Sequence, residues 1–306
     1  MNNTTAPLVS VIIPTYNHAQ FLGKALESVI EQTYKNWEAI VIDNHSTDNT
    51  GEVMRRFADP RISYLNIDNN GVIAASRNMG ICAARGEWVA FLDSDDWWSI
   101  DKLQVCLDYI DGADIIYHDL RIEREKRSMW RTSTLKSRQL RKPVLIDLLN
   151  NGNLIPNSSV IIRRKLLQRI GGISENAKMI ASEDYNTWLR VAKVTNLFFH
   201  VPQTLGCYRV HRSSVSQRNI SFPLKCATDE FVELLTVVQR DRLNSTIYYI
   251  CGRHQYKNRE YDSALYNIKE CIKGASVRNR VAAAATLVLI FIRLCYGKFV
   301  RARSNE

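Results

Sequence analysis

Three apolar runs in the first third of the chain each end abruptly in a polar loop. The runs and their loops are Leu8–Ile13 with Thr15–His18, Trp37–Ile42 with Asp43–Asp48, and Trp88–Leu92 with Asp93–Asp96. Segments with helical spacing of apolar residues separate the runs, and this alternation is typical of a parallel sheet covered by helices on both faces. Because parallel strands end at one edge of a sheet, where open α/β sheets bind ligands, the sequence predicts a site at that edge.

The third of these loops is the most acidic. Asp93, Asp95 and Asp96 lie within four positions, directly after a run that reads as a buried strand. Clustered carboxylates repel one another, and a divalent cation that carries phosphates would neutralise them. The alternative is that the Asp and Ser side chains only form a turn before a helix over Ile100–Ile110, which Ser99 would cap. The residues alone leave both interpretations open.

Other local signals give the remaining elements. We expect Pro14 to end the first strand, Ser158–Ile162 to form a strand, and Asn196–Tyr208 to form a strand, a turn and a second strand. Arg121–Lys142 has no periodicity and carries 9 Lys and Arg against 2 Asp and Glu, so it is either an exposed loop or an extended pair. From Phe222 onward the pattern is helical, and we therefore place a domain boundary between residues 220 and 221.

The charge of the chain is uneven. Residues 1–120 contain 8 Lys and Arg against 17 Asp and Glu, whereas residues 251–306 contain 11 against 4. The acidic first part is unlike a nucleic-acid surface, and the basic segments indicate an anionic partner, either phosphate groups or a membrane face. Val281–Ile292 is uncharged and too short to span a bilayer, which needs about 20 residues. It would lie in a membrane interface or dock on the core.

Several protein classes are disfavoured by what the sequence lacks. No G-x-G-x-x-G follows the first strand and no G-x-x-x-x-G-K-[ST] is present, which argues against dinucleotide-dependent enzymes and P-loop NTPases. The seven cysteines form no C-x-x-C pair, and the polar start predicts no secretory signal. We therefore expect a cytoplasmic protein with reduced thiols.

Five motifs occur in an order that resembles a known family. They are Val11–Asn17, Val41–Asp48, Ser76–Asn78, Phe91–Asp96 and Ser182–Tyr185. Together they resemble a family 2 glycosyltransferase of the bacterial surface-polysaccharide type, over about residues 8–212. The resemblance implies a GT-A fold, which is Rossmann-like with a mostly parallel sheet and helices on both faces, followed here by the helical region 221–306.

The resemblance also implies an activity and a set of site residues. The family transfers a sugar with inversion from a nucleotide donor, usually a UDP-sugar of the glucose, galactose, GlcNAc or GalNAc class, with Mn²⁺ or Mg²⁺. Carried over by position, Asp184 is the general base, Asp95 and His211 hold the metal, and Glu183 and Trp97 support the acceptor side. The nucleotide-sugar pocket would contain Pro14, Thr15, Asn17, Asp43, Arg77, Asp93 and Ser94. The alternatives are that His211 has only a structural role, and that Glu183 and Asp184 are only acidic residues in the first turn of a helix.

Two departures from the family pattern refine the expectation. Gly171–Glu175 reads G-G-I-S-E where relatives commonly have G-G-F-D-E, which leaves details of the acceptor loop open. No Q-x-x-R-W is present, so we expect addition of a single sugar. The acceptor would be a glycan linked to polyprenyl diphosphate, used in O-antigen, capsule or other surface-polysaccharide assembly by an enzyme peripheral on the inner face of the membrane. The rival hypotheses are a nucleotidyltransferase and a non-catalytic nucleotide- or glycan-binding protein.

Overall fold

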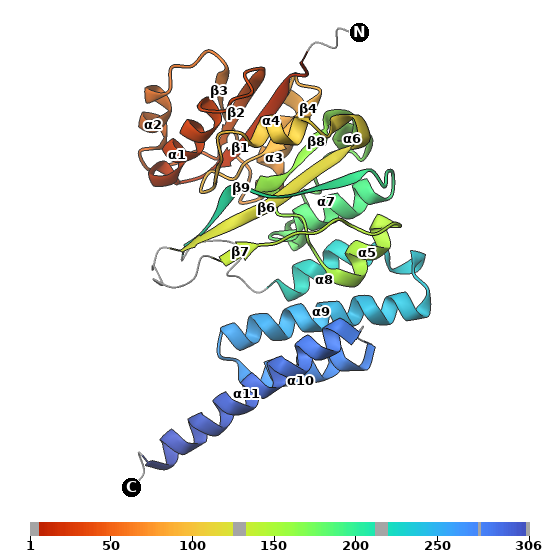
Figure 1. Ribbon diagram of the computed structural model, residues 1–306. Coiled ribbons are helices and arrows are strands. Elements are labelled where there is room, and N and C mark those ends of the chain that lie inside the picture. Colours follow the sequence, from red (N-terminus) through yellow and green to blue (C-terminus); the bar gives the residue numbers. More distant parts are fainter. Residues whose placement is uncertain (1–5, 125–132, 212–219, 275–276, 304–306) are drawn as a thin grey trace.

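A computed structural model describes residues 6–124, 133–211, 220–274 and 277–303, and a single sheet lies at its centre (Figure 1). Its first half is parallel, in the order β3-β2-β1-β4. These strands are β1 (Val9–Thr15), β2 (Trp37–Asp43), β3 (Ile62–Asn66) and β4 (Trp88–Phe91). The loops after β1, β2 and β4 therefore meet at one edge, as the sequence predicts.

The second half of the sheet is mixed. It contains β5 (Trp97–Trp98), β6 (Ile115–Arg124), β7 (Ser133–Leu135), β8 (Ile161–Arg163) and β9 (Phe198–Val210). β8 runs antiparallel to its neighbours β4 and β6, β6 and β9 are parallel, and β5 and β7 are antiparallel additions. The sheet is therefore mostly parallel, as expected; β8 is antiparallel because the chain leaves β6 at the site edge and re-enters through β8 from that same edge.

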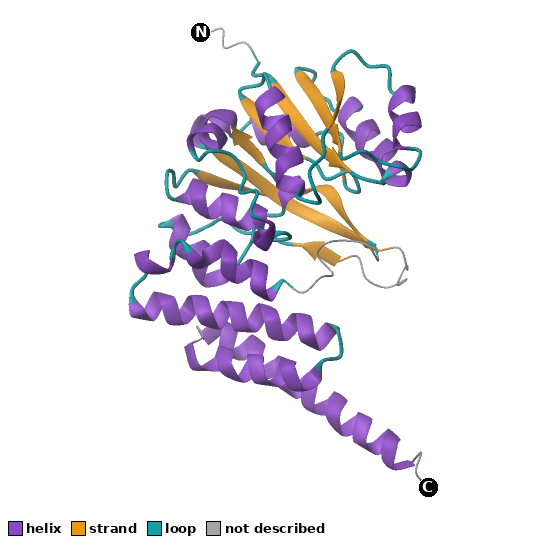
Figure 2. Ribbon diagram, turned by 180° about the vertical axis from the view of Figure 1, so that it is seen from behind, coloured by secondary structure: helices purple, strands orange, loops and turns teal. Residues whose placement is uncertain are grey.

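Helices cover both faces of the sheet (Figure 2). The side chains of the central strands alternate between the two faces. Val11 and Ile13 of β1 pack in one buried cluster with α1 (Ala19–Ile30) and α4 (Lys102–Leu107). Ile12 points to the opposite cluster. That second cluster includes residues of α3 (Ile73–Ala83), α5 (Val144–Asn151), α6 (Arg164–Arg169) and α7 (Glu183–Ala192). The short helix α2 (Thr50–Arg56) lies beside α1. This is the two-faced burial expected of central strands.

Four α-helices follow β9 in the described part of the chain. They are α8 (Ser221–Asp229), α9 (Val237–Lys257), α10 (Tyr261–Gly274) and α11 (Val277–Arg303). Leu224 of α8 and Leu243 of α9 belong to the buried cluster beneath the sheet, whereas Ala264, Ile268 and Ile290 form part of a separate core between the last helices. α11 extends beyond α9 and α10 at the end of the molecule far from β1–β4 (Figures 1 and 2). The boundary between residues 220 and 221 stays a prediction.

Some local expectations differ from the structure. β1 continues through Pro14 to Thr15. The Ile12 carbonyl accepts a hydrogen bond from the Leu92 N–H, directly after β4. Pro14 therefore lies beyond the end of β4, where its missing N–H costs no hydrogen bond within the sheet. The expected helix over Ile100–Ile110 begins only at Lys102, and Asn196–Tyr208 is one strand whose pairing shifts in register. Within Arg121–Lys142, β6 and β7 form the extended pair, and residues 125–132 lie outside the described part of the chain.

Candidate active site

The four side chains in the loop after β4 contact three distant segments of the chain. Asp93 bonds to Arg77 of α3, and Ser94 Oγ lies 2.8 Å from His18 Nδ1 before α1. Asp95 Oδ2 lies 2.8 Å from His211 Nε2 after β9. Asp96 Oδ1 accepts a hydrogen bond from the Arg209 backbone N–H at 2.9 Å. The acidic loop is therefore the point where three distant parts of the chain are fixed to the sheet edge.

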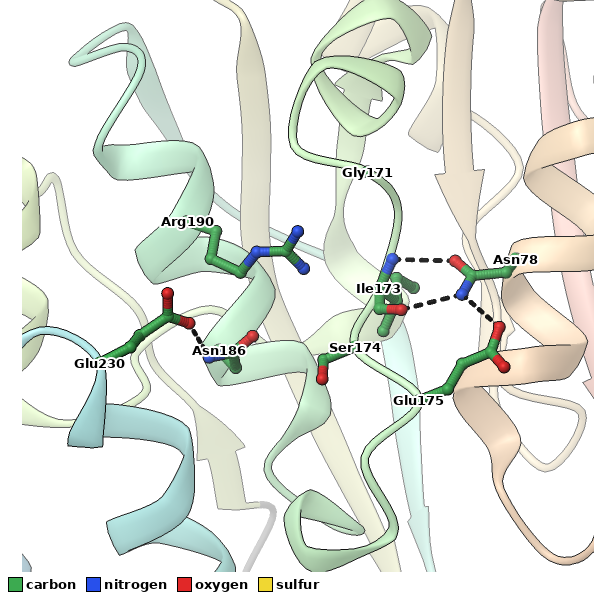
Figure 3. Close-up of a pocket in the computed structure, with 8 residues that line it drawn as sticks. All are labelled: Asn78, Gly171, Ile173, Ser174, Glu175, Asn186, Arg190 and Glu230. Carbon is green, nitrogen blue, oxygen red and sulfur yellow. Dashed lines mark hydrogen bonds between the residues drawn. The ribbon is translucent and has the colours of Figure 1, made fainter.

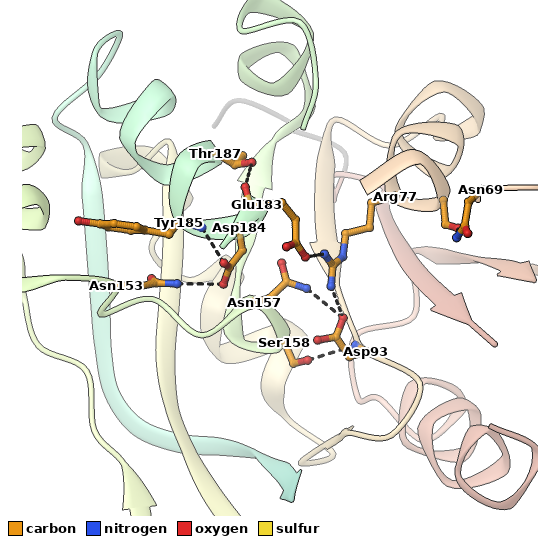
Figure 4. Close-up of polar contacts among 11 residues, drawn as sticks. Asn69, Arg77, Asp93, Asn153, Asn157, Ser158, Glu183, Asp184, Tyr185 and Thr187 are labelled. Carbon is orange, nitrogen blue, oxygen red and sulfur yellow. Dashed lines mark hydrogen bonds and ion pairs between the residues drawn. The ribbon is translucent and has the colours of Figure 1, made fainter. Parts of the chain in front are cut away.

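Arg77 bridges two acids across the site (Figure 4). Its guanidinium donates to Asp93 Oδ1 at 2.8 Å and to Glu183 Oε1 at 2.7 Å. The side chain is 4% exposed. Burial opposes the charged guanidinium, but the charges of Asp93 and Glu183 outweigh it and raise the pKa of Arg77 above its ordinary value. The bridge locks the start of α7 to the acidic loop.

Asp184 follows Glu183 in the first turn of α7 and is partly buried. Its Oδ2 accepts a hydrogen bond from Asn153 Nδ2 at 2.9 Å, and its Oδ1 accepts one from the Tyr185 backbone N–H. Burial and the charge of Glu183 raise the pKa of Asp184 to about 7, against the opposing effects of Arg77 and the two hydrogen bonds. A carboxyl group with a pKa near neutrality is suited to accept a proton during catalysis.

Asp95 and His211 lie in contact, as the metal prediction requires, with the His18 ring centroid 5.7 Å from that of His211. Burial lowers the pKa of His18, Asp95 opposes this effect, and His211 adds to it. The part of the chain that the structure describes holds no cluster of three or more His, Cys, Asp or Glu side chains placed for a metal. Mg²⁺ and similar ions often take one or two protein ligands plus substrate phosphates, so the Asp95–His211 pair fits such an ion.

Asp96 is buried beside this pair. Its Oδ2 has no hydrogen-bond partner among the residues described. Burial, and then the charges of Asp95 and Asp93, raise the pKa of Asp96 well above its ordinary value. Negative charge on Asp96 is therefore disfavoured in this loop, and a cation near Asp95 would reduce the repulsion among the three carboxyl groups.

The proposed nucleotide residues lie at the ends of β1 and β2, where Thr15 is paired with Asp43. Buried Asp43 accepts from the Ser46 backbone N–H at 3.0 Å and from the Tyr64 hydroxyl at 2.5 Å. Asn17 adopts a left-handed conformation (φ 50°) and its Oδ1 accepts from the Thr47 N–H at 2.7 Å. These bonds join the two loops into one surface.

Pro14 and Thr15 are buried at the end of β1, whereas Trp97, which follows the acidic loop, is half-buried. Thr15 Oγ1 has no hydrogen-bond partner within the described ranges. Lys24 Nζ lies 3.3 Å from the centroid of a Trp97 ring, and the Arg209 guanidinium carbon lies 5.0 Å from it. Trp97 is therefore fixed by cation–π contacts beside the acidic loop.

A polar hollow of about 390 Å³ lies next to the Gly171–Glu175 segment (Figure 3). Asn78, the residue after Arg77, fixes this segment: its Oδ1 accepts from Ile173 N and its Nδ2 donates to Ile173 O, both at 2.8 Å. Asn186 and Arg190 of α7 line the opposite side with Glu230. Because amide, guanidinium and carboxylate groups all face it, the hollow suits a ligand with many hydroxyl groups.

Three site residues were not expected from the sequence. Asn157 donates to Asp93 Oδ1 at 3.1 Å, Ser158 Oγ accepts from the Asp93 N–H at 3.1 Å, and Asn153 bonds to Asp184. All three precede the antiparallel strand β8, so they lie at its amino end and hence at the site edge. The sequence signal for these residues was the polar cluster around Pro156 before an apolar run. That signal indicates the site only when β8 is known to be antiparallel, because the residues before β8 then lie at the site edge.

Comparison with known proteins gives the family. The model of glycosyl transferase family 2 matches residues 10–171, which is more than half of the chain. The chain belongs to glycosyl transferase family 2. One relative is an Escherichia coli protein, WfgD, named UDP-Glc:alpha-D-GlcNAc-diphosphoundecaprenol beta-1,3-glucosyltransferase. This family 2 chain is 30% identical to WfgD over 217 residues, and the match covers 68% of the chain and 79% of WfgD.

Other relatives match over shorter stretches. A putative teichuronic acid biosynthesis glycosyltransferase, TuaG of Bacillus subtilis, is 40% identical over 106 residues, 34% of this chain. The chain covers 42% of the length of TuaG and 62% of an uncharacterized glycosyltransferase from Rickettsia typhi.

Solved structures identify the fold. The structure of S. aureus TarS 1-349 in complex with UDP-GlcNAc has a TM-score of 0.62 at 17% identity, covering 92% of this chain and 89% of that one. Mannosyltransferase PcManGT from Pyrobaculum calidifontis, in complex with GDP-Man and Mn²⁺, also has a TM-score of 0.62 at 18% identity, covering 94% and 81%. The mixed, mostly parallel sheet of this family 2 chain is thus the GT-A fold, as expected.

Proposed function

We propose that the chain transfers one sugar from a UDP-sugar to a hydroxyl of a glycan acceptor, with inversion at the anomeric carbon. The observation that carries this proposal is the Arg77 bridge, which holds Asp93 of the acidic loop and Glu183 of α7 within one ion-pair network. Asp184, the adjacent residue, is thereby fixed at the same edge as the nucleotide residues Thr15 and Asp43.

Asp184 acts as the general base in this proposal. As a carboxylate it would take the proton from the acceptor hydroxyl while that oxygen attacks the anomeric carbon, opposite the departing UDP. Its pKa of about 7 makes it a stronger base than an ordinary aspartate and leaves it largely ionised just above neutral pH. Asn153 keeps the carboxylate oriented through the hydrogen bond to Oδ2.

Asp95 and His211 would hold Mn²⁺ or Mg²⁺. When bound, the ion supplies Lewis-acid assistance to the leaving diphosphate. Arg77, by contrast, is buried and paired with two carboxylates, so we assign it a positioning role at the edge of the nucleotide-sugar pocket, between Asp93 and Glu183. Trp97 and the Asn78-fixed segment Gly171–Glu175 would flank the acceptor.

The donor and acceptor classes are supported by the names of the relatives. WfgD is named for a UDP-Glc donor and a GlcNAc-diphosphoundecaprenol acceptor, and TarS was crystallised with UDP-GlcNAc. We propose the same chemistry here, with a polyprenyl-diphosphate-linked glycan as acceptor in surface-polysaccharide assembly at the cytoplasmic side of the membrane. No helix in the described ranges meets the length and apolarity needed to cross a bilayer.

Product analysis tests the proposal. The full chain is incubated with UDP-glucose, UDP-galactose, UDP-GlcNAc and UDP-GalNAc in turn, with Mn²⁺ and a short-chain lipid diphosphate GlcNAc acceptor. We expect acceptor-dependent UDP release with one donor and, by NMR, an inverted anomeric configuration in the product. Release of pyrophosphate from a nucleoside triphosphate and a sugar phosphate would favour a nucleotidyltransferase, and binding without turnover would favour the non-catalytic alternative.

A further inference from the structure

Among the side chains of α11 that the structure describes, two apolar faces can be distinguished, and only one of them packs against other helices. Ala283, Thr286 and Ile290 are buried against the neighbouring helices α9 and α10. A second set is exposed to solvent, and we call it the outer stripe: Val281, Ala284, Ala285, Val288, Leu289 and Ile292. Val281, Val288 and Ile292 are 67%, 58% and 58% exposed, which is unusual for large apolar side chains.

The spacing of these residues places the outer stripe on a single line. Positions 281, 284, 285, 288, 289 and 292 follow the i, i+3, i+4, i+7 rule, so they share one side of the helix. At about 100° per residue, that side lies roughly opposite the buried residues Ala283 and Ile290. The stripe therefore faces away from the body of the molecule along about three turns.

Basic residues border the stripe. By the same helical geometry, exposed Arg280 and Arg293 lie on opposite flanks, between the outer stripe and the buried face. The sequence of α11, residues 277–303, contains six Lys and Arg and no Asp or Glu. An apolar stripe with basic flanks is the arrangement of helices that lie in the plane of an anionic lipid surface, where long basic side chains reach the headgroups.

The charge distribution favours this occupant over a second copy of the chain. Two copies paired through the outer stripe would bring Arg280 and Arg293 close to their counterparts, and α11 supplies no acid to pair with them. A bilayer that contains acidic phospholipids provides both the apolar layer and the negative charge. α11 also projects past α9 and α10, so a flat surface can approach it without meeting the sheet (Figures 1 and 2).

We propose that the outer stripe of α11 inserts into the interface of an anionic bilayer and anchors the protein peripherally. This inference goes beyond the proposed sugar transfer and does not depend on it, because vesicle binding requires neither donor nor acceptor. If the acceptor is lipid-linked, the anchor would keep the enzyme at the surface that carries its substrate.

Vesicle flotation with the full chain tests the proposal. We expect the protein to float with vesicles of phosphatidylcholine and phosphatidylglycerol, and much less with phosphatidylcholine alone. The double variant Val288→Glu/Leu289→Glu should lower the binding constant at least about tenfold, since both apolar contacts are lost. The matched control is Ile100→Glu, which changes a residue that is 57% exposed on the sheet domain, and it should bind like the wild type.

A second variant separates charge from apolar contact. Arg280→Gln/Arg293→Gln should bind anionic vesicles about 30-fold more weakly, and the loss should shrink at high salt. All the altered side chains are exposed, so circular dichroism and thermal unfolding should match the wild type. Flotation of the Val288→Glu/Leu289→Glu variant at the wild-type level would overturn the proposal. The proposal would also be overturned if the wild-type protein does not bind anionic vesicles and instead forms a dimer that the Val288→Glu/Leu289→Glu substitutions dissociate.

Discussion

Arg77 lies between two acids that come from different parts of the chain, and its removal would leave both partly or wholly buried without their cation. We expect Arg77→Met to reduce the free energy of unfolding by about 3–5 kcal/mol, because breaking a buried ion pair leaves uncompensated charge. Urea unfolding measures this change. Lys273→Met is the control: the Lys273 side chain is 71% exposed in its pair with Glu270 on the surface of α10, so its loss should cost far less. Equal costs for the two variants would contradict the bridging role.

The pKa of Asp184 predicts how activity depends on pH. The base works only as a carboxylate, so kcat/KM should be lost as the pH falls through about 7 and should level off above it. Asn153→Ala removes a hydrogen bond that favours the carboxylate, so the midpoint should move to higher pH. Asn258→Ala, far from the site at the end of α9, should leave the profile unchanged. A flat profile between pH 5 and pH 8 in the wild type would contradict the assignment.

Individual site residues were predictable where the signal was local. Asp93, Asp95 and Asp184 stand out because carboxylates cluster directly after a buried strand or at a helix start. The ion pair between Arg77 and Glu183 spans 106 positions, and no periodicity or turn signal links them. The same holds for Asp95 and His211, which only the family resemblance assigned to one site.

The Gly171–Glu175 segment begins with two glycines in the left-handed conformation. Gly172 has φ 77°, and a Cβ there would lie 2.7 Å from Asn78 Oδ1. Gly172→Ala should therefore cost about 1–3 kcal/mol of stability and displace the segment from Asn78. Thermal unfolding and the KM for the acceptor measure the two effects. Gly51→Ala is the control, since nothing lies within 4 Å of its Cβ and it sits in α2; it should be neutral or stabilise by up to about 1 kcal/mol.

At the scale of elements, the parallel half of the sheet was predictable and the mixed half was not. Each run from β1 to β4 is followed by its own helix or turn signal. A helical crossover returns the chain to the edge where the previous strand began, so successive strands are parallel. The direction of β8 depends on the edge from which the chain re-enters the sheet, which is a non-local property. The two-residue strand β5 exists only because Trp97 and Trp98 pair with β9, more than 100 positions away.

The whole molecule should be stabilised by its ligands. If Asp95 and His211 hold a cation against the UDP diphosphate, UDP with Mn²⁺ should raise Tm more than UDP with a chelator. At a free ligand concentration of 100 times Kd, the stabilisation should be about 2.7 kcal/mol. Asp95→Asn should lose the metal-dependent part of the shift, whereas Asp101→Asn, at the start of α4, should keep it. An equal shift with and without metal would argue against a cation at this pair.

The central claim is that loops from distant parts of the chain meet at one sheet edge, with a nucleotide-sugar site facing the base Asp184. The most direct test compares UDP binding and sugar transfer in Asp184→Asn, with Asp111→Asn as an exposed control outside the site. We predict that Asp184→Asn binds UDP with Mn²⁺ like the wild type and transfers sugar about 10²–10⁴-fold more slowly. Transfer by Asp184→Asn at the wild-type rate would contradict the account.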